Sequence, residues 1–324
     1  MKIRATVARL LVLATAVLAA ACVHAQAAYP SRPIQLVVGY AAGGGTDLLA
    51  RIVAAKMAEG LGQPILVENK VGAQAIIAAQ YVAKASPDGY TLMLGPSGPV
   101  SMNPALYSKL PYSPLRDFAP ISLIGTFPLV LVVGQSHPAK TVQQLVDYAK
   151  ATPDKANYGA SAAPFQLAAE LFKQKTGTAF QHIAYKGSNE SVNAAATGEI
   201  SMTIADPPPV VGQYQAGRVR VLAVTAPTRH PGWPGVPTMA EAGIPDMEIA
   251  LWAGVLAPAG TPQPIIRRLH EEVVRVMKLP EVRERIAALG VDPASNTPEE
   301  FRSLIAADIA KWTAVAKAAN IKAD

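Results

Sequence analysis

Three glycines followed by a threonine and an aspartate, Gly43 to Asp47, form the segment of this chain that is best suited to contact a ligand. The segment stands between an apolar run, Ile34–Val38, and an amphipathic stretch that begins at Asp47. Glycines let the backbone approach a bound molecule, and free N–H groups at a helix start attract anions. The helix dipole favours a carboxylate there by about 0.3–1 kcal/mol, or about 2 kcal/mol when it is partly buried. The same residues equally fit a tight turn in which Thr46 or Asp47 caps the helix.

Two further loops follow strand-like runs and carry hydroxyl groups. Ser97 lies in the segment Gly95–Gly98, after the run Thr91–Leu94. Ser161, Ala162 and Ala163 precede a helix that we expect to begin at Gln166, and they predict a second anion-binding helix start. Either loop also fits a simple connection without a ligand.

Polar residues at the ends of two other predicted strands complete the set of site residues. Lys186 and Gly187 follow the run Ala179–Tyr185, where they could reach a ligand, although a single lysine is commonly solvated. Asp206 ends the apolar run Ile200–Ala205 and precedes three prolines. A carboxylate in this position is suited to contact an amine or a hydroxyl of a ligand, and it is equally suited to cap the next helix.

The sequence gives little support to catalysis, metal binding or a cofactor. The segment around Ser97 closes with Pro99 where a nucleophile elbow has glycine. The glycine run lacks the lysine of a phosphate-binding loop and the G-x-G-x-x-G spacing of a dinucleotide site. Histidines show no metal-binding spacing, so we expect neither a metal nor a cofactor. A serine hydrolase that uses Ser97 or Ser161 remains the enzymatic alternative.

Short apolar runs alternate with longer helical patterns, which predicts an α/β fold with mainly parallel sheets flanked by helices. One predicted helix, from about Asp47 to Leu61, places Leu49, Ile52, Val53 and Met57 on one face. Near the C-terminus, the segment from Thr297 to Glu300 has the pattern of a capping box with proline at the first helical position.

Two apolar segments are expected to cross between two lobes. Ser122–Val133 is too long for one ordinary strand and holds Pro128 in its middle, which favours two strands joined by a bend. Ile249–Ala257 fits the return crossing. The sequence therefore predicts a two-lobed binding protein in which residues 28–124 and 250–324 form a discontinuous first lobe and residues 125–249 form the second. The cleft between the lobes is the expected binding site.

The first 27 residues have the pattern of a cleavable export signal. Lys2, Arg4 and Arg9 precede an apolar stretch of about a dozen residues, Leu10–Ala21, which is too short to span a bilayer. The single cysteine, Cys22, lies inside this segment, and lipid attachment there is the minor alternative. Cleavage after Ala27 would leave a mature chain without a thiol, and therefore without disulfides or cysteine-bound metals.

The charge of the mature chain argues against nucleic acid as a partner. Of the 29 Lys and Arg residues, three lie in the predicted signal, which leaves 26 against 23 Asp and Glu. The remaining basic residues are dispersed, with no basic run and few aromatic residues between them.

The order of these loops along the chain resembles the Bug-type solute receptors of tripartite tricarboxylate transporters. The resemblance runs from Tyr29 to about Ile321. The segments that carry it are Tyr29–Ile34, the loop at 42–47, Val67–Lys70, Pro87–Thr91, Asn103–Tyr107, Leu110–Tyr112 with Asp117 and Phe118, Tyr185–Gly187, Leu222–Thr225, Val236–Thr238 with Glu241–Gly243, and Leu256–Pro262.

The resemblance implies a monomeric periplasmic protein that closes two lobes on a small carboxylate, such as a di- or tricarboxylate, an acidic amino acid or an aromatic acid. It implies delivery of that ligand to the membrane subunits of a transporter, with a ligand sensor for a signalling partner as the alternative role. By motif, the ligand would meet Gly43–Asp47 from one lobe and Ser161–Ala163 from the other, with Asp206 matching an aspartate that ends the equivalent strand in many members.

One departure from the family pattern lies at residues 161–166. Members commonly carry a longer glycine- and hydroxyl-rich loop with a histidine where this chain has Gln166. Fewer hydroxyls and the added Phe165 predict a drier, smaller or aromatic-accommodating pocket.

Overall fold

The computed structural model describes residues 29–319 and Lys322. The predictions for the signal segment and for Cys22 lie outside the described residues. Among the described helices, none is both long enough and apolar enough to cross a bilayer.

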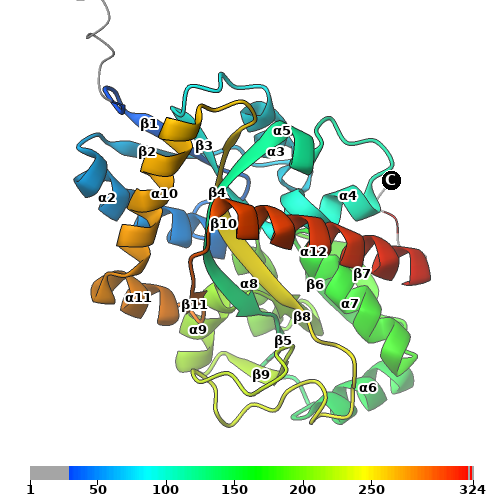
Figure 1. The fold of residues 1–324 in the computed structure, drawn as a ribbon. Helices are drawn as coiled ribbons and strands as arrows, with labels where there is room; N and C mark the ends of the chain where they lie inside the picture. The colour runs from blue at the N-terminus through cyan, green and yellow to red at the C-terminus, as the bar shows by residue number, and fades with distance from the viewer. Residues whose placement is uncertain (1–28, 320–321, 323–324) are drawn as a thin grey trace, which may run out of the picture.

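The described chain builds two β-sheets, each covered by helices (Figure 1). The first sheet has the strand order β11-β4-β10-β3-β1-β2 and the second β7-β6-β8-β5-β9. We call the first sheet and its helices the first lobe, and the second sheet and its helices the second lobe. The first lobe comprises β1 (Ile34–Val38), α2 (Gly45–Leu61), β2 (Ile65–Asn69), η1 (Ala73–Ala75), α3 (Ile76–Ala83), β3 (Thr91–Pro96), η2 (Gly98–Met102), α4 (Asn103–Leu106), α5 (Pro114–Asp117), β4 (Phe118–Pro128), β10 (Ala250–Pro258), α10 (Gln263–Met277), α11 (Pro280–Ala287), β11 (Asp292–Pro293) and α12 (Pro298–Ala319). The second comprises β5 (Val130–Gly134), α6 (Val142–Ala151), β6 (Asn157–Ala160), α7 (Ala163–Thr176), β7 (Gln181–Ala184), α8 (Ser188–Thr197), β8 (Met202–Ala205), α9 (Pro207–Gln215) and β9 (Val219–Val224).

The sheets are mixed, where the sequence suggested mainly parallel ones. Strand β1 pairs in parallel with β2 and β3, whereas β10 runs antiparallel to β3 and β4. In the second sheet β6 is parallel to β7 and β8, whereas β5 is antiparallel to β8 and β9. Most antiparallel pairs involve β10 or β5, the crossing strands that run against the parallel strands of their sheets, and the short β11 adds one more by pairing with β4. The α/β two-lobed class itself is confirmed.

The crossing between the lobes consists of two strands joined by a bend, as Pro128 predicted. Strand β4 ends at Pro128 and β5 begins at Val130, so the long apolar run is two strands with a bend at Leu129. The buried hydroxyl of Thr225 accepts a hydrogen bond from the Leu129 N–H (2.8 Å) and donates one to the Ile249 carbonyl (2.6 Å). One threonine therefore ties the outgoing and returning crossings together. The exact lobe boundaries at 124/125 and 249/250 stay a prediction.

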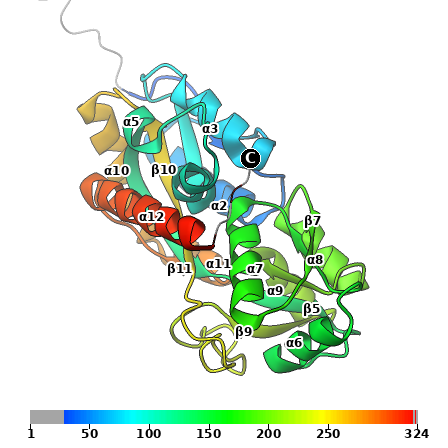
Figure 2. The ribbon, with the colours of Figure 1, turned by 90° about the vertical axis from the view of Figure 1, so that its right-hand side faces the viewer.

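Helix α12 lies across the first lobe and reaches α7 of the second (Figures 1 and 2). Its Phe301 ring packs on Gly254, where any side chain would collide with it, and meets the edge of the Trp252 ring at 5.2 Å. The predicted capping box starts this helix: Thr297 N–H donates to Glu300 Oε2 (2.9 Å) and Glu300 N–H to Thr297 Oγ1 (3.1 Å). These contacts fix the helix on the sheet that carries the crossing strands.

Most predicted helices and strands appear within one or two residues of their expected bounds. Helix α2 buries the predicted face of Leu49, Ile52, Val53 and Met57. Two elements differ by more: β4 begins at Phe118, where Ser122 was expected, and helix α7 begins at Ala163 and not at Gln166. Pro164 is accommodated because the second position of a helix has no partner for its N–H. The predicted loop at 161–166 is therefore mostly a helix start.

Candidate functional site

Four helix starts from the two lobes meet at one cavity. They belong to α2 from the first lobe and to α7, α8 and α9 from the second, and the π-helical turn η2 adds a fifth backbone turn from the first lobe. The cavity has a volume of about 30 Å³. Its walls are formed by Tyr40, Ala41, Gly44, Gly45, Thr46, Pro96, Ser97, Gly98, Phe127, Ser161, Pro164, Phe165, Gly187, Ser188, Asp206 and Leu251. We call it the first cavity.

Three buried polar atoms in the first cavity have no hydrogen-bond partner among the described residues. They are Ser97 Oγ, Ser161 Oγ and Asp206 Oδ1. Leaving a buried polar atom unpaired costs about 1–3 kcal/mol, so such atoms are rare in folded proteins unless a ligand or water pairs with them. Two of them come from the second lobe and one from the first. The cavity is therefore equipped to hold a polar molecule between the lobes.

The walls of the first cavity include no Lys, Arg or His side chain among the described residues. Its ionisable side chains are Tyr40 and Asp206. Burial, with smaller contributions from Tyr112 and Asp206, raises the pKa of Tyr40 above its usual value, so that it stays neutral. Attraction for an anion comes instead from the N–H groups at the starts of α2, α7 and α8 and from the helix dipoles, since α9 begins with three prolines that have no N–H.

Asp206 departs from the behaviour of an ordinary aspartate. Its side chain is buried, with 5% of the residue exposed, and it directly precedes the first turn of α9. Burial raises the pKa of this carboxyl to about 6, against the opposing effects of hydrogen bonds from the Ser188 hydroxyl and from its own backbone N–H. It is the one acidic side chain in the wall of the first cavity.

The lobes touch one another around the cavity through small residues. A Cβ built on Gly45 of α2 would lie 2.2 Å from Asp206 Oδ2 and 3.0 Å from Pro208 Cγ, both in the second lobe. A Cβ on Gly98 would lie 3.1 Å from Pro164 Cγ, again across the cleft. The structure is therefore a closed form, in which backbone of one lobe rests on side chains of the other.

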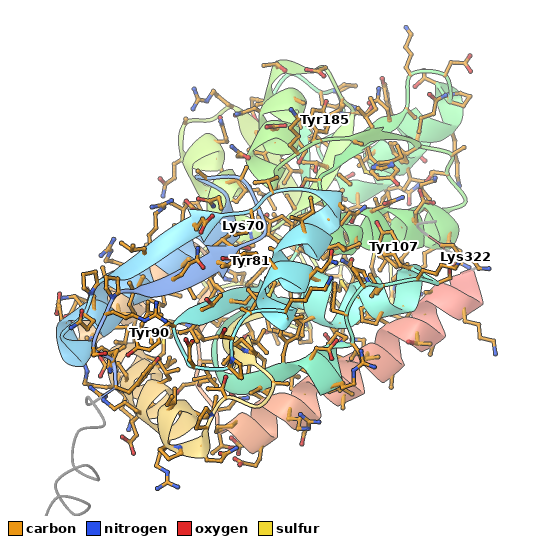
Figure 3. The ribbon with its side chains drawn as sticks, turned by 90° about the horizontal axis from the view of Figure 1, so that it is seen from above. Lys70, Tyr81, Tyr90, Tyr107, Tyr185 and Lys322 are labelled. Carbon is orange, nitrogen blue, oxygen red and sulfur yellow. The ribbon has the colours of Figure 1, made fainter. Side chains whose placement is uncertain are left out.

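A second cavity, of about 250 Å³, adjoins the first and shares Tyr40 and Ser161 with it. It lies between the loop after β2 and the strands β6 and β7. Figure 3 shows Tyr185 on the second lobe, and Lys70 and Tyr81 on the part of the first lobe that faces it. The remaining residues around it are Gly39, Val71, Gly72, Ala73, Gln74, Ala75, Ala160, Ala162, Gln166, His182, Ala184, Tyr185 and Lys186.

The first-lobe wall of the second cavity is strained. Ala73, Gln74 and Ala75 have φ angles of 45°, 54° and 65°, a left-handed conformation that costs roughly 1–2 kcal/mol per non-glycine residue. The strained turn directs Gln74 Oε1 into buried space, where it has no partner among the described residues. Strain of this kind concentrates at binding sites, which is consistent with a role for this turn in the cleft.

Nine of the twelve residues predicted from the sequence lie in the walls of these two cavities, and the set as a whole stays a prediction. The first cavity includes Gly44, Gly45, Thr46, Ser97, Ser161, Gly187 and Asp206, and the second includes Ser161, Ala162 and Lys186. Gly43, Asp47 and Ala163 line neither.

Asp47 supports the glycine loop from behind. Its Oδ2 accepts hydrogen bonds from Gly43 N–H and Arg51 Nε, each at 2.9 Å, and its Oδ1 accepts one from Asn69 Nδ2 at 2.9 Å. Burial acts to raise the pKa of Asp47, but the hydrogen bonds from Arg51, Gly43 and Asn69 outweigh it and hold the pKa below its usual value. The carboxylate therefore fixes the shape of the loop whose N–H groups face the cleft.

Several other wall residues had no signal in the sequence, whereas Ser188 could have been found. Ser188 directly follows Gly187 at the start of α8, so the helix-start argument applied to the other loops would have included it. Phe127 and Leu251 come from the crossing strands, and nothing in a strand pattern reveals which apolar residue faces a cleft. Phe165, noted from the sequence as a departure, does line the first cavity.

Two α/β lobes, joined by crossing strands and closed over a polar cavity, define a solute-binding protein. The chain belongs to the tripartite tricarboxylate transporter receptor family, since the family's sequence profile, "Tripartite tricarboxylate transporter family receptor", matches residues 49–321. Members of this family are binding receptors and not enzymes. Protein BugT of Bordetella pertussis is 36% identical over 297 residues, which cover 91% of each chain.

Solved structures of two proteins from Rhodopseudomonas palustris share this fold. Rpa4515 with adipate is 37% identical, with a TM-score of 0.88 over 91% of this chain and 99% of the other. MatC (Rpa3494) with bound malate is 32% identical, with a TM-score of 0.84 over 89% of this chain and 99% of the other.

Proposed function

We propose that this protein captures a small carboxylate in the first cavity and delivers it to the membrane subunits of a tripartite tricarboxylate transporter. The observation that carries the proposal is the convergence of three helix starts with free N–H groups (α2, α7 and α8), the dipole of α9 and two unpaired serine hydroxyls on a cavity whose described wall has no cationic side chain. Neutral N–H and O–H donors that converge in this way suit a carboxylate, whose two oxygens each accept more than one hydrogen bond.

The size of the first cavity suits one carboxylate group. A buried water needs about 10–15 Å³ by the same measure, so about 30 Å³ accommodates two oxygen-sized atoms. The rest of the ligand would extend past Tyr40 and Ser161 into the second cavity. Lys186 and Gln74 in that wall favour a second acidic or polar group on the ligand. A dicarboxylate fits both cavities, in keeping with the adipate and malate bound by relatives.

The expected affinity follows from the number of donors. Hydrogen bonds to a charged group contribute about 1.5–3 kcal/mol each. A few of them, less the cost of ordering the ligand and closing the lobes, give a Kd from roughly micromolar to submicromolar, or about −8 to −10 kcal/mol.

Isothermal titration with adipate, malate, citrate, acidic amino acids and benzoate tests the proposal, and native mass spectrometry of the purified protein would reveal any acid already bound. Replacement of both serines (Ser97→Ala with Ser161→Ala) should weaken binding by at least tenfold, because each removes one donor. Ser303→Ala, at an exposed serine of α12 that bonds only within its own helix, is the matched control. Binding of sugars or metal ions with no response to any carboxylate would refute the proposal.

The site of action that we propose is the periplasm, on the basis of the export signal predicted for residues 1–27. Deleting the gene separates transport from sensing. A transport receptor predicts loss of uptake of the bound acid while the genes induced by that acid still respond. Loss of induction with unchanged uptake would instead favour a sensor.

A further inference from the structure

The carboxyl group of Asp206 conflicts with an anionic ligand. It lies in the wall of the cavity where the ligand's carboxylate is proposed to bind, and its Oδ1 is buried without a partner among the described residues. Oδ2 is held close to the backbone of Gly45 on the opposite lobe. An ionised aspartate here would face the bound carboxylate at short range, and like charges in buried space repel strongly.

Among the described residues in the wall of the first cavity, none is a cation that could separate the two anions, and Lys186, next to Gly187, lines the second cavity instead. The charged or titratable groups on the elements packed against the start of α9 each have other surroundings. On α2, Asp47 is paired with Arg51; on α8, Glu190 accepts from Lys186 N–H. On β9, Arg220 donates to backbone carbonyls, including that of Ala139 at 2.9 Å. Near Pro207, His230 accepts from Gly232 N–H and packs on Trp233, and Tyr40 is a neutral acid.

We infer that Asp206 binds the ligand as a carboxylic acid, donating its proton in a hydrogen bond to the ligand's carboxylate, so that capture of the anion takes up one proton from solution. The inference rests on the proposed function, because it concerns how the same cavity holds a carboxylate. The proton balance is simple: the free protein with ionised Asp206, one proton and the anion give a complex whose Asp206 is neutral. An acid-to-carboxylate pair is among the stronger hydrogen bonds available in proteins.

The position of Asp206 makes this protonation accessible near neutral pH. In the closed form, burial raises its pKa to about 6 before any ligand is present, and a bound anion would raise it further. Because the pKa is higher in the complex than in the free protein, binding takes up a proton at pH values between the two. The affinity should therefore fall as pH rises, by up to about tenfold per pH unit above the pKa of the free protein.

The inference assigns Asp206 a part in release as well as in capture. Gly45 of the first lobe covers the carboxyl only while the lobes are closed. Opening would return Asp206 to water, where an aspartate ionises near its ordinary pKa. The ionised group would then repel the departing anion, which favours release once the lobes have opened.

The experiment is isothermal titration of adipate and malate into the mature protein from about pH 6.5 to 8.5, where carboxylic acids of ordinary pKa are fully ionised. Each titration is repeated in two buffers of different ionisation enthalpy, which counts the protons exchanged. The wild type should take up close to one proton at neutral pH and lose affinity as pH rises. Asp206→Asn keeps the size and a donor, so it should bind with no proton uptake and with affinity that does not vary with pH. His270→Gln, at a histidine of α10 that lines neither cavity, should leave affinity and proton uptake unchanged.

Two results would overturn the inference while leaving the proposed function intact. One is pH-independent binding by the wild type without proton exchange. The other is tight binding of an amino acid together with weak binding of the same acid without its amino group, where Asp206→Asn removes this preference. Asp206 would then be an ionised partner for the ammonium group of the ligand. Failure of both adipate and malate, and of the wider carboxylate panel, at every pH would refute the proposed function and this inference with it.

Discussion

The contact of Gly45 with the second lobe offers a direct test of closure. Gly45 stands at the first turn of α2, and its backbone rests against Asp206 and Pro208 of the second lobe. Gly45→Ala adds one methyl group at this point. The new Cβ would lie 2.2 Å from Asp206 Oδ2 and 3.0 Å from Pro208 Cγ, where ordinary contacts begin near 3.4 Å. The lobes would have to part by about 1 Å to admit it.

The cost falls on the closed form alone. Overpacking by a methyl group costs about 1–3 kcal/mol in a close-packed contact. If binding requires closure, that cost converts to a Kd about 5- to 150-fold higher. The fold of each lobe is not affected, because the collision is between lobes, and alanine is a better helix former than glycine by up to about 1 kcal/mol. The Tm of the ligand-free protein should therefore stay the same or rise slightly.

Isothermal titration with the acid that binds the wild type best measures the loss of affinity, and thermal unfolding without ligand measures the effect on the fold. Gly212→Ala is the matched control, since Gly212 lies in helix α9 with no atom within 4 Å of a built Cβ. It should leave Kd unchanged. Wild-type affinity in Gly45→Ala, with the Tm preserved, would refute the view that ligands bind to this closed form.

Three further substitutions test the supporting structure. Thr225→Val leaves the Leu129 N–H and the Ile249 carbonyl without their side-chain partner at the crossing, so the free energy of unfolding should fall by about 1–3 kcal/mol in urea denaturation; an unchanged value would mean that the hydroxyl is not needed there. Thr297→Ala removes the cap of α12 and should cost about 0.5–2 kcal/mol with no change in Kd, whereas a change in Kd would contradict a purely structural role. Asp47→Asn should destabilise most above pH 4 and progressively less as pH falls, because a carboxyl whose pKa is lowered by folding stabilises the fold only while ionised; a cost that does not vary with pH from about 2 to 7 would contradict this.

Local patterns in the sequence predicted the elements and their ends well, since these depend on neighbours along the chain. Pro128 predicted the break between β4 and β5, and Thr297 with Glu300 predicted the start of α12. The start of α7 was expected at Gln166, three residues too late, although proline, here Pro164, is accepted within a first helical turn.

The cavity itself depends on contacts between distant parts of the chain, which a single sequence does not display. Nothing around Phe127 or Leu251 indicates that they line a cleft, because strands of this kind are apolar on both faces. Asp206 was recognised from its place at the end of a strand, but its burial depends in part on the approach of Gly45 on the other lobe. The resulting change in its pKa was therefore outside the reach of sequence patterns.

Glycine meets proline at three contacts between the lobes, which bears on how a small ligand can drive closure. Gly45 meets Pro208, Gly98 meets Pro164, and Gly290 meets Pro207. Neither residue type loses rotamer freedom when it is buried, whereas longer side chains lose up to about 2 kcal/mol each. Closing these surfaces therefore costs little side-chain conformational entropy. A ligand must bind the closed form about 5.5 kcal/mol more tightly than the open form to shift their populations from 1:99 to 99:1. Two to four charge-assisted hydrogen bonds that form only in the closed cavity supply a difference of that size. Donors from both lobes give such a difference because they meet the ligand together only when the lobes are closed. A single strong cation on one lobe would hold the ligand in the open form as well, and would therefore be less well suited to a receptor that must also open.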